Sequence, residues 1–401
     1  MKCLSLGLAA IIGLSILSGA GHAQSGDDRD RALIAVLEES YVAAPDPALK
    51  YLLAESYARL GQRDKALEAL RVVVASNQPF LPPETNPLWR YAKDGEFAPL
   101  LKVLRDRVPV TSNGVVEFTL SGRPIVTEGI AYDDSSRRVF VGDLNSRSIF
   151  EISRLGVVKP FVAGLKNQPY GMTVDLKRRY LWVVLSNFLA GEKTPRTELM
   201  RIHLDSRKTA TFSHPEARSL NDLVVGPDGD VYASDIGAAS VWRISPATRR
   251  WTALVKPGSV SFPNGIAIDE SGKRIFLAQG RRIVAINLAD GSMVPIKKPD
   301  TLSTLGTDGL YYRDGNLFGI QNITSPGRVV RMLLNKQRDE ITGFDVIESA
   351  NPIFDLPTTG AFVGDKFLII ANSQIYRIDR RALDPSQLKP VVLLSYKVPK
   401  P

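Results

Sequence analysis

Six short segments of the sequence are similar to one another, and each has a side chain at the equivalent position, directly before a small hydrophobic stretch. In five of the six segments the next residue is glycine. The residues at this point are Glu128, Tyr170, Asp222, Asn264, Asp308 and Thr359. Three carboxylates and an amide are side chains that bind hard cations or transfer protons. Carboxylates that converge in a narrow space repel one another, so they need a cation, shared protons or wide separation.

Oxygen is the main ligand atom available to such a site, because the 401-residue chain contains one Cys and three His. An all-oxygen ligand set favours Ca²⁺, and after it Mg²⁺. Calcium takes roughly six to eight oxygens, so Glu128, Asn264 and Asp308 would need further ligands. Asn221, backbone carbonyls and water are the candidates to supply them. The alternative interpretation is that Asn264–Gly265 and Asp308–Gly309 are ordinary turn dipeptides.

The elements that must position these residues repeat along the chain. The six glycine-equivalent positions are 129, 171, 223, 265, 309 and 360, so the unit recurs every 42 to 52 residues. Each segment is followed by a polar turn and then by β-rich stretches with a period of two. Four strands per unit of this length are typical of propeller blades, and six units predict a mainly β, six-bladed β-propeller over residues 115–398. Its first strands line a central channel, so the six positions converge on one opening.

The last blade leaves one question open in the sequence. Gln374–Ile378 has the pattern of a third strand. The ring must also close, and the last outer strand is either Val115–Leu120 or Val391–Tyr396.

Residues 27–107 have a helical period instead. Tyr57, Leu60–Gly61 and Ala66 resemble the inner positions of a tetratricopeptide repeat, with Leu60–Gly61 in the turn between two helices. One repeat is too short to form a stable array, so flanking helices at about 30–43 and 96–106 are expected to complete it. The region is either a peptide-binding groove or a small helical cap packed against the propeller, and we favour the cap.

Residues 1–23 have the pattern of a secretory signal peptide. Lys2 precedes an apolar stretch from Leu4 to Leu17, and small residues lead to an expected cleavage between Ala23 and Gln24. Cleavage would remove Cys3 and His22, so the exported chain would keep no Cys. The protein is therefore expected to be periplasmic or secreted, with no stable membrane insertion after cleavage. An uncleaved anchor is the alternative.

Four ordered motifs resemble those of the regucalcin/gluconolactonase family of six-bladed propellers. They are Thr127–Glu128–Gly129, Leu220–Asn221–Asp222, Phe262–Pro263–Asn264–Gly265 and Thr307–Asp308–Gly309. The resemblance implies that Glu128, Asn264 and Asp308 bind one divalent ion. It also implies that Asn221 helps to hold substrate or metal and that Asp308 is the catalytic base. Asn221–Asp222–Leu223 differs from the family's Asn-Asp-Gly, and Ser219 stands where the family often has a sugar-contacting Arg.

These observations lead to a functional hypothesis and one rival. The hypothesis is an exported, Ca²⁺-dependent hydrolase in which a metal-activated water opens a lactone or related ester, with Asp308 and Asn221 as catalytic residues. Asn221, Asp222, Tyr170 and Asn167 are the candidates for substrate contact. The rival is a non-catalytic periplasmic propeller with a structural Ca²⁺, which binds a small ligand, or a protein partner through the helical region.

Other function classes fit less well. A Ser/His/Asp esterase needs a histidine at the mouth, whereas His203 and His214 are expected at the surface. The formal net charge of +9 is spread over the 401 residues, and the Arg/Lys pairs mostly fall at expected blade turns. Because no aromatic residues alternate with these pairs, we expect no nucleic-acid partner.

Overall fold

The computed structural model of the chain describes residues 26–107, 111–121, 125–187, 196–280, 282–323, 325–378 and 385–398. The predicted signal segment 1–23 lies outside these residues, so it stays a prediction. Within the described ranges, no helix combines the length and the apolar character needed to cross a membrane.

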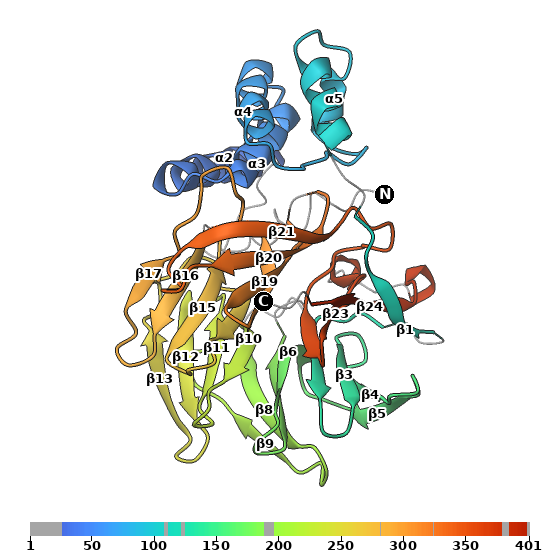
Figure 1. The fold of residues 1–401 in the computed structure, drawn as a ribbon, viewed down its shortest axis with the longest axis vertical. Helices are drawn as coiled ribbons and strands as arrows, with labels where there is room; N and C mark the ends of the chain where they lie inside the picture. Colours follow the sequence, from blue (N-terminus) through green and yellow to red (C-terminus); the bar gives the residue numbers. More distant parts are fainter. Residues whose placement is uncertain are drawn as a thin grey trace.

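The prediction of a six-bladed propeller is confirmed, because the strands of the described residues form six four-stranded antiparallel sheets (Figure 1). The first three blades are β2 (Ile130–Asp133), β3 (Arg138–Asp143), β4 (Ser148–Ile152), β5 (Val158–Val162); β6 (Gln168–Asp175), β7 (Tyr180–Ser186), β8 (Thr197–His203), β9 (Thr209–Phe212); and β10 (Leu220–Val225), β11 (Val231–Asp235), β12 (Ser240–Ser245), β13 (Arg250–Val255). The next two are β14 (Ile266–Ile268), β15 (Arg274–Gln279), β16 (Arg282–Asn287), β17 (Met293–Pro295); and β18 (Thr307–Arg313), β19 (Asn316–Gln321), β20 (Arg328–Leu334), β21 (Ile341–Ser349).

The sixth blade joins the two ends of the propeller. It runs β22 (Gly360–Val363), β23 (Lys366–Ile370), β24 (Val391–Lys397) and β1 (Val115–Leu120). The outermost strand is therefore β1, which pairs with β24 from Val115↔Ser395 to Leu120↔Val391. This pairing answers the question that the sequence left open.

The prediction of a strand at Gln374–Ile378 is wrong. The segment contains the short 3₁₀ helix η4 (Ile375–Arg377), which begins after Gln374 in a left-handed conformation with φ of 58°. The Gln374 amide donates to the Lys389 carbonyl at 2.9 Å. This turn replaces the strand, and β24 takes the third place in the blade.

The first strands of neighbouring blades approach closely around the central channel. A Cβ atom on Gly129 would lie 2.0 Å from the Tyr170 carbonyl oxygen, and one on Gly265 would lie 2.2 Å from that of Asp308. Thr359 closes the ring by donating its hydroxyl to the Glu128 carbonyl. Glycine at these positions is therefore required by space, as the sequence predicted.

The helical region is confirmed as helical, and a tetratricopeptide repeat stays a prediction. The described residues contain α2 (Gly26–Ala43), α3 (Pro47–Arg59), α4 (Arg63–Ala75), the 3₁₀ helix η2 (Pro87–Tyr91) and α5 (Phe97–Arg107). Helix α3 begins at Pro47, and the Asp46 side chain accepts from the Ala48 N–H as its N-cap. The turn from α3 to α4 uses Gly61 at φ of 71°, where glycine avoids a steric cost.

The helical region packs against the propeller beside β16, β20 and β21 (Figure 1). Leu305 of the propeller is buried in the same hydrophobic core as α3 and α4. The Leu81 N–H donates to the Ser325 carbonyl at 2.8 Å, and the buried Arg328 donates to the Gln78 side chain at 3.2 Å. This arrangement agrees with a helical cap.

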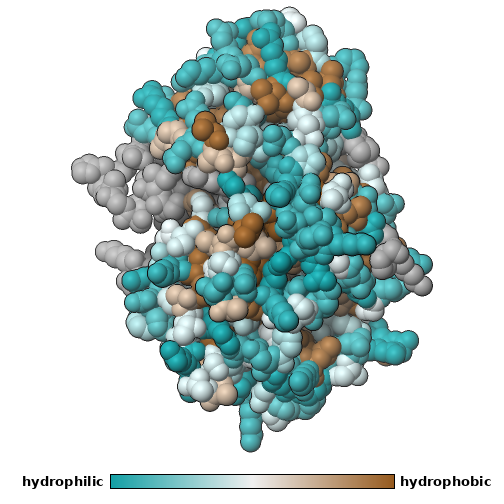
Figure 2. Space-filling view, turned by 60° about the vertical axis from the view of Figure 1, so that its left-hand side comes forward, coloured by the Kyte–Doolittle hydropathy of each residue, from teal (hydrophilic) through white to brown (hydrophobic). Residues whose placement is uncertain are grey.

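The face of the molecule seen in Figure 2 is mainly hydrophilic, with small separate hydrophobic areas. Large apolar side chains that are strongly exposed include Leu155 and Val42, which are 89% and 84% exposed. Scattered exposed apolar residues are normal for a folded surface, so they do not indicate a partner.

Candidate functional site

The predicted site residues lie at the starts of the first strands. Glu128 and Asn264 stand two residues before β2 and β14, whereas Asp222 and Asp308 are early residues of β10 and β18. These strands belong to four different blades. The structure brings the side chains into one cluster, because the charges of Asp308 and Asp222 both act on Glu128.

Glu128 is the most unusual member of this cluster. The residue is only 5% exposed, and its Oε2 atom is buried without a hydrogen-bond partner. Burial raises the pKa of Glu128 well above its ordinary value, and the negative charges of Asp308 and Asp222 raise it further. A buried carboxylate with these neighbours is stable only when it is protonated or neutralised by a cation.

The other two carboxylates are also shifted towards neutral pH. Burial raises the pKa of Asp308 to about 6, although hydrogen bonds from Asn322 and Asn264 oppose the increase. Burial also raises the pKa of Asp222 to about 7, against hydrogen bonds from the Leu223 and Ile266 N–H groups. Clusters of shifted carboxylates are frequent at functional sites.

Amide side chains connect the cluster. Asn221 Nδ2 donates to Asn264 Oδ1 at 2.7 Å, which links β10 to the segment before β14. Asn322 Nδ2 donates to Asp308 Oδ2 at 2.6 Å and to the Pro357 carbonyl at 2.9 Å. Sequence analysis missed Asn322, because it follows the second strand of its blade and lies outside the repeated segments.

Tyr311 is a second site residue that sequence analysis missed. Its hydroxyl accepts from the Gly360 N–H at 2.6 Å, and its side chain lines a channel cavity of about 200 Å³ together with Asp222. Burial, followed by the charge of Asp222, raises the pKa of Tyr311 well above its ordinary value. Tyr311 is three residues after Asp308, so regular alternation would place the two on opposite faces, but the pairing of β18 with β19 shifts register between Thr307 and Leu310.

Two candidates for substrate contact have other surroundings. The buried Tyr170 packs in an apolar cluster with Trp182 and Leu220, and its hydroxyl lies 3.4 Å from Gln168 Oε1. Asn167 is half-buried in the bend before β6. The role of each in binding substrate stays a prediction.

The two described histidines lie away from the cluster. His203 ends β8, where its ring meets that of Tyr180. His214 follows β9 and packs with Trp242 and Trp251, at ring-centroid distances of 4.9 and 5.7 Å. Their positions agree with the expectation that neither lies at the mouth.

The residues can be tested for their fit to a divalent cation. Across the described ranges, no three His, Cys, Asp or Glu side chains form a group that could hold a metal ion. The predicted ligand set contains only two carboxylates, Glu128 and Asp308, and its third member is the amide of Asn264. All of its ligand atoms are oxygens, and Glu128 Oε2 has no donor, so the set fits a hard cation. Calcium itself stays a prediction.

The fold and the cluster define a class: a six-bladed propeller with an acidic, amide-lined mouth and an added helical region. No protein-family model and no curated protein matches the sequence. Among solved structures, the chain is similar to a gluconolactonase from Xanthomonas campestris, with a TM-score of 0.50 and 15% identity over 70% of this chain and 88% of that one. It is also similar to a luciferin-regenerating enzyme, with a TM-score of 0.50 and 17% identity over 71% and 95% of the two chains. At these identities the similarity establishes the propeller fold alone.

Proposed function

We propose that the protein is a divalent-cation-dependent hydrolase that opens a lactone or related ester at the propeller mouth. The observation that supports this proposal most strongly is the buried, unpartnered Glu128 Oε2 beside Asp308 and Asp222. An unpaired buried carboxylate oxygen is destabilising, and such groups persist in proteins where they serve a ligand. The similarity to enzymes of this fold agrees with the proposal.

Each residue of the cluster has a defined task in this proposal. Glu128, Asn264 and Asp308 hold the cation, and Asn221 orients Asn264 through its 2.7 Å hydrogen bond. A bound divalent cation polarises a carbonyl group and makes a water molecule more acidic. Asp308 accepts the proton of the attacking water. Burial raises the pKa of Asp308 to about 6, and a bound cation would lower it, so the carboxylate is ionised at neutral pH and can accept a proton.

Asn322 is a positioning residue for the proton acceptor. Its 2.6 Å hydrogen bond to Asp308 Oδ2 fixes the carboxylate, and its second bond to the Pro357 carbonyl fixes the amide. The carboxylate is therefore oriented before substrate arrives, which reduces the reorganisation required during the reaction.

The experiment compares Asp308→Asn with Asp314→Asn, a matched control in the exposed turn of the same blade. A panel of γ- and δ-lactones and phenyl acetate is assayed after chelation and again after Ca²⁺ is restored. We expect chelation to abolish hydrolysis and Asp308→Asn to lower kcat/KM by about 10²-fold or more. Unchanged turnover in Asp308→Asn would falsify its role. Calcium binding without hydrolysis of any ester would instead favour the rival, a binding propeller with a structural ion.

We also infer that the chain is exported by its first 23 residues. The test is the N-terminal sequence of the protein recovered from its natural compartment. A mature N-terminus at Gln24 supports export with cleavage, whereas retention of Met1 or Lys2 contradicts cleavage and favours the uncleaved anchor.

A further inference from the structure

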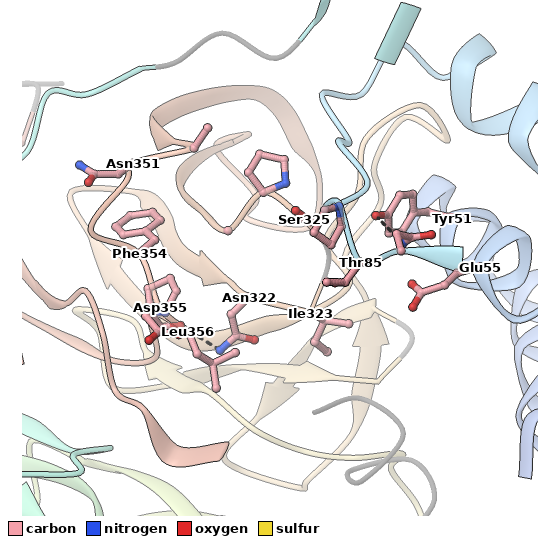
Figure 3. Close-up of a pocket in the computed structure, with 16 residues that line it drawn as sticks. Tyr51, Glu55, Thr85, Asn322, Ile323, Ser325, Asn351, Phe354, Asp355 and Leu356 are labelled. Atoms are coloured by element: carbon pink, nitrogen blue, oxygen red, sulfur yellow. Dashed lines mark hydrogen bonds between the residues drawn. The ribbon is translucent and has the colours of Figure 1, made fainter. Parts of the chain in front are cut away.

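A second cavity lies between the helical region and the propeller (Figure 3). Its volume is about 220 Å³, well above the space that a single water molecule needs. Tyr51 and Glu55 project into it from α3, and Phe354 and Asp355 face them from the loop between β21 and β22. The cavity therefore exists only because the helical region is added to the propeller.

This cavity reaches the residues of the mouth through Asn322. The Asn322 side chain lines the cavity and donates to Asp308 Oδ2 at 2.6 Å. Pro357, whose carbonyl accepts the other Asn322 hydrogen bond, also lines it. The Asn322 side chain therefore stands directly between the cavity and the Asp308 carboxylate.

The loop opposite the helices is held in a fixed shape. Ala350 and Leu356 both line the cavity and have left-handed backbones, with φ of 55° and 61°. Asn351 Oδ1 accepts from the Ile353 N–H at 2.9 Å, and the Tyr376 hydroxyl donates to Asp355 Oδ1 at 2.6 Å. Non-glycine residues in this conformation are unfavourable, and they occur often where a loop must clamp a ligand.

The polar groups of the cavity are acidic or neutral. Glu55 and Asp355 supply carboxylates, and none of the described lining residues is a lysine or an arginine. Arg59 binds Glu55 Oε1 at 2.8 Å, and Arg377 lies 3.7 Å from Asp355 Oδ2, but neither arginine lines the cavity. The wall therefore offers carboxylate acceptors to a ligand donor, and its described residues offer no lining cation to a ligand anion.

We propose that this cavity binds the substituent of the substrate that lies away from the reacting carbonyl. It accepts substituents that end in a hydroxyl or ammonium donor and rejects those that end in a carboxylate. Glu55 is the specificity-determining residue, because it presents a buried carboxylate from the helical region. This inference rests on the proposed hydrolysis at the mouth, and it assigns a role in substrate selection to α3.

The test uses three γ-butyrolactones with a three-carbon side chain that ends in a hydroxyl, an ammonium or a carboxylate group. Binding is measured by calorimetry in full-length Asp308→Asn, so that hydrolysis does not interfere, and hydrolysis is measured in the natural protein. We expect the carboxylate probe to bind at least tenfold more weakly than the other two.

Two variants, each combined with Asp308→Asn, test the assignment to the cavity wall. Glu55→Gln is expected to reduce the discrimination against the carboxylate probe several-fold. The control Glu68→Gln, at an exposed position of α4 outside the cavity, should leave this discrimination unchanged. Thr85→Lys adds a cation at an exposed lining position and is expected to favour the carboxylate probe. Since Thr85 is exposed, this variant stays informative even if Glu55→Gln fails to fold.

The outcomes separate this inference from the proposed function. The cavity inference is overturned if no probe binds or if the carboxylate probe binds as tightly as the others. It is also overturned if Thr85→Lys leaves the preference for the hydroxyl and ammonium probes unchanged. Hydrolysis without discrimination refutes the cavity inference alone. Discrimination in binding without any hydrolysis refutes the proposed reaction and supports the cavity as a binding site.

Discussion

Asp46 is expected to hold the helical region in the position that forms the cavity. Its Oδ1 atom accepts from the Ala48 N–H at 2.9 Å, and its Oδ2 atom accepts from the Thr304 N–H of the propeller at 3.1 Å. The Lys298 ammonium lies 3.7 Å from Oδ2, and the Asp46 side chain has no exposed surface. One carboxylate therefore caps α3 and joins it to the propeller.

The effect of Asp46→Ala can be worked from these contacts. Loss of the N-cap costs about 1 kcal/mol. Leaving the buried Thr304 N–H without an acceptor costs about 1–3 kcal/mol more, and Lys298 loses its neighbouring charge. We expect Asp46→Ala to lower the free energy of unfolding by roughly 3 kcal/mol or more. Asp46→Asn, which keeps one acceptor oxygen, should lose about half of that.

Urea denaturation and probe binding measure the two consequences. Asp64→Asn is the control, because its side chain is 92% exposed, and it should change the free energy by less than about 0.5 kcal/mol. Asp46→Ala should also weaken binding of the hydroxyl probe, since α3 carries Glu55. Equal stability of Asp46→Ala and Asp64→Asn would refute the reasoning.

Three further predictions concern the propeller. Gly265→Ala would place a Cβ atom 2.2 Å from a carbonyl oxygen of the next blade, so thermal denaturation should show a loss of about 1–3 kcal/mol. Gly95→Ala, with no atom within 4 Å of the added Cβ, is the control, and an equal effect would contradict the close approach. Burial alone would raise the pKa of Asp133, but hydrogen bonds led by Arg179 lower it below the unfolded value of about 3.9. The ionised Asp133 side chain therefore stabilises the fold above about pH 4, and this stabilisation is lost as the pH falls. Asp133→Asn should make the free energy of unfolding less dependent on pH on the acid side. An unchanged slope of the free energy of unfolding between pH 2 and 5 would count against this role of Asp133. Ca²⁺ at 100 times its dissociation constant should raise the free energy of unfolding by about 2.7 kcal/mol, and Glu128→Gln should abolish most of the increase; the same increase in the variant would exclude Glu128 as a ligand.

The local patterns of the chain predicted much of the fold. Strand alternation and the recurrence of glycine depend on neighbouring residues, so the six blades and the converging polar positions were predictable from sequence. Tyr311 did not follow from alternation, because the register of β18 shifts between Thr307 and Leu310. The strand predicted at Gln374–Ile378 was wrong, because a left-handed residue and a side-chain bond to Lys389 start a turn there.

Contacts between distant segments decided the rest. The choice of β1 as the closing strand depends on pairing Val115–Leu120 with a segment near the other end of the chain. Asn322 reaches Asp308 because β18 and β19 are adjacent strands of one blade, and no repeated motif marks it.

The sequence by itself determined the blade repeat, the helical character of residues 27–107 and the oxygen-bearing side chains at the six repeated positions. Each of these depends on residue types or on periods within a short stretch. Only the tertiary structure decided that α3 faces the loop between β21 and β22 and forms a cavity beside the mouth. That position is set by the contacts of Asp46 and Gln78 with the propeller, which join residues about 250 positions apart. Interactions over such separations depend on how whole elements pack, and composition and periodicity carry no record of them.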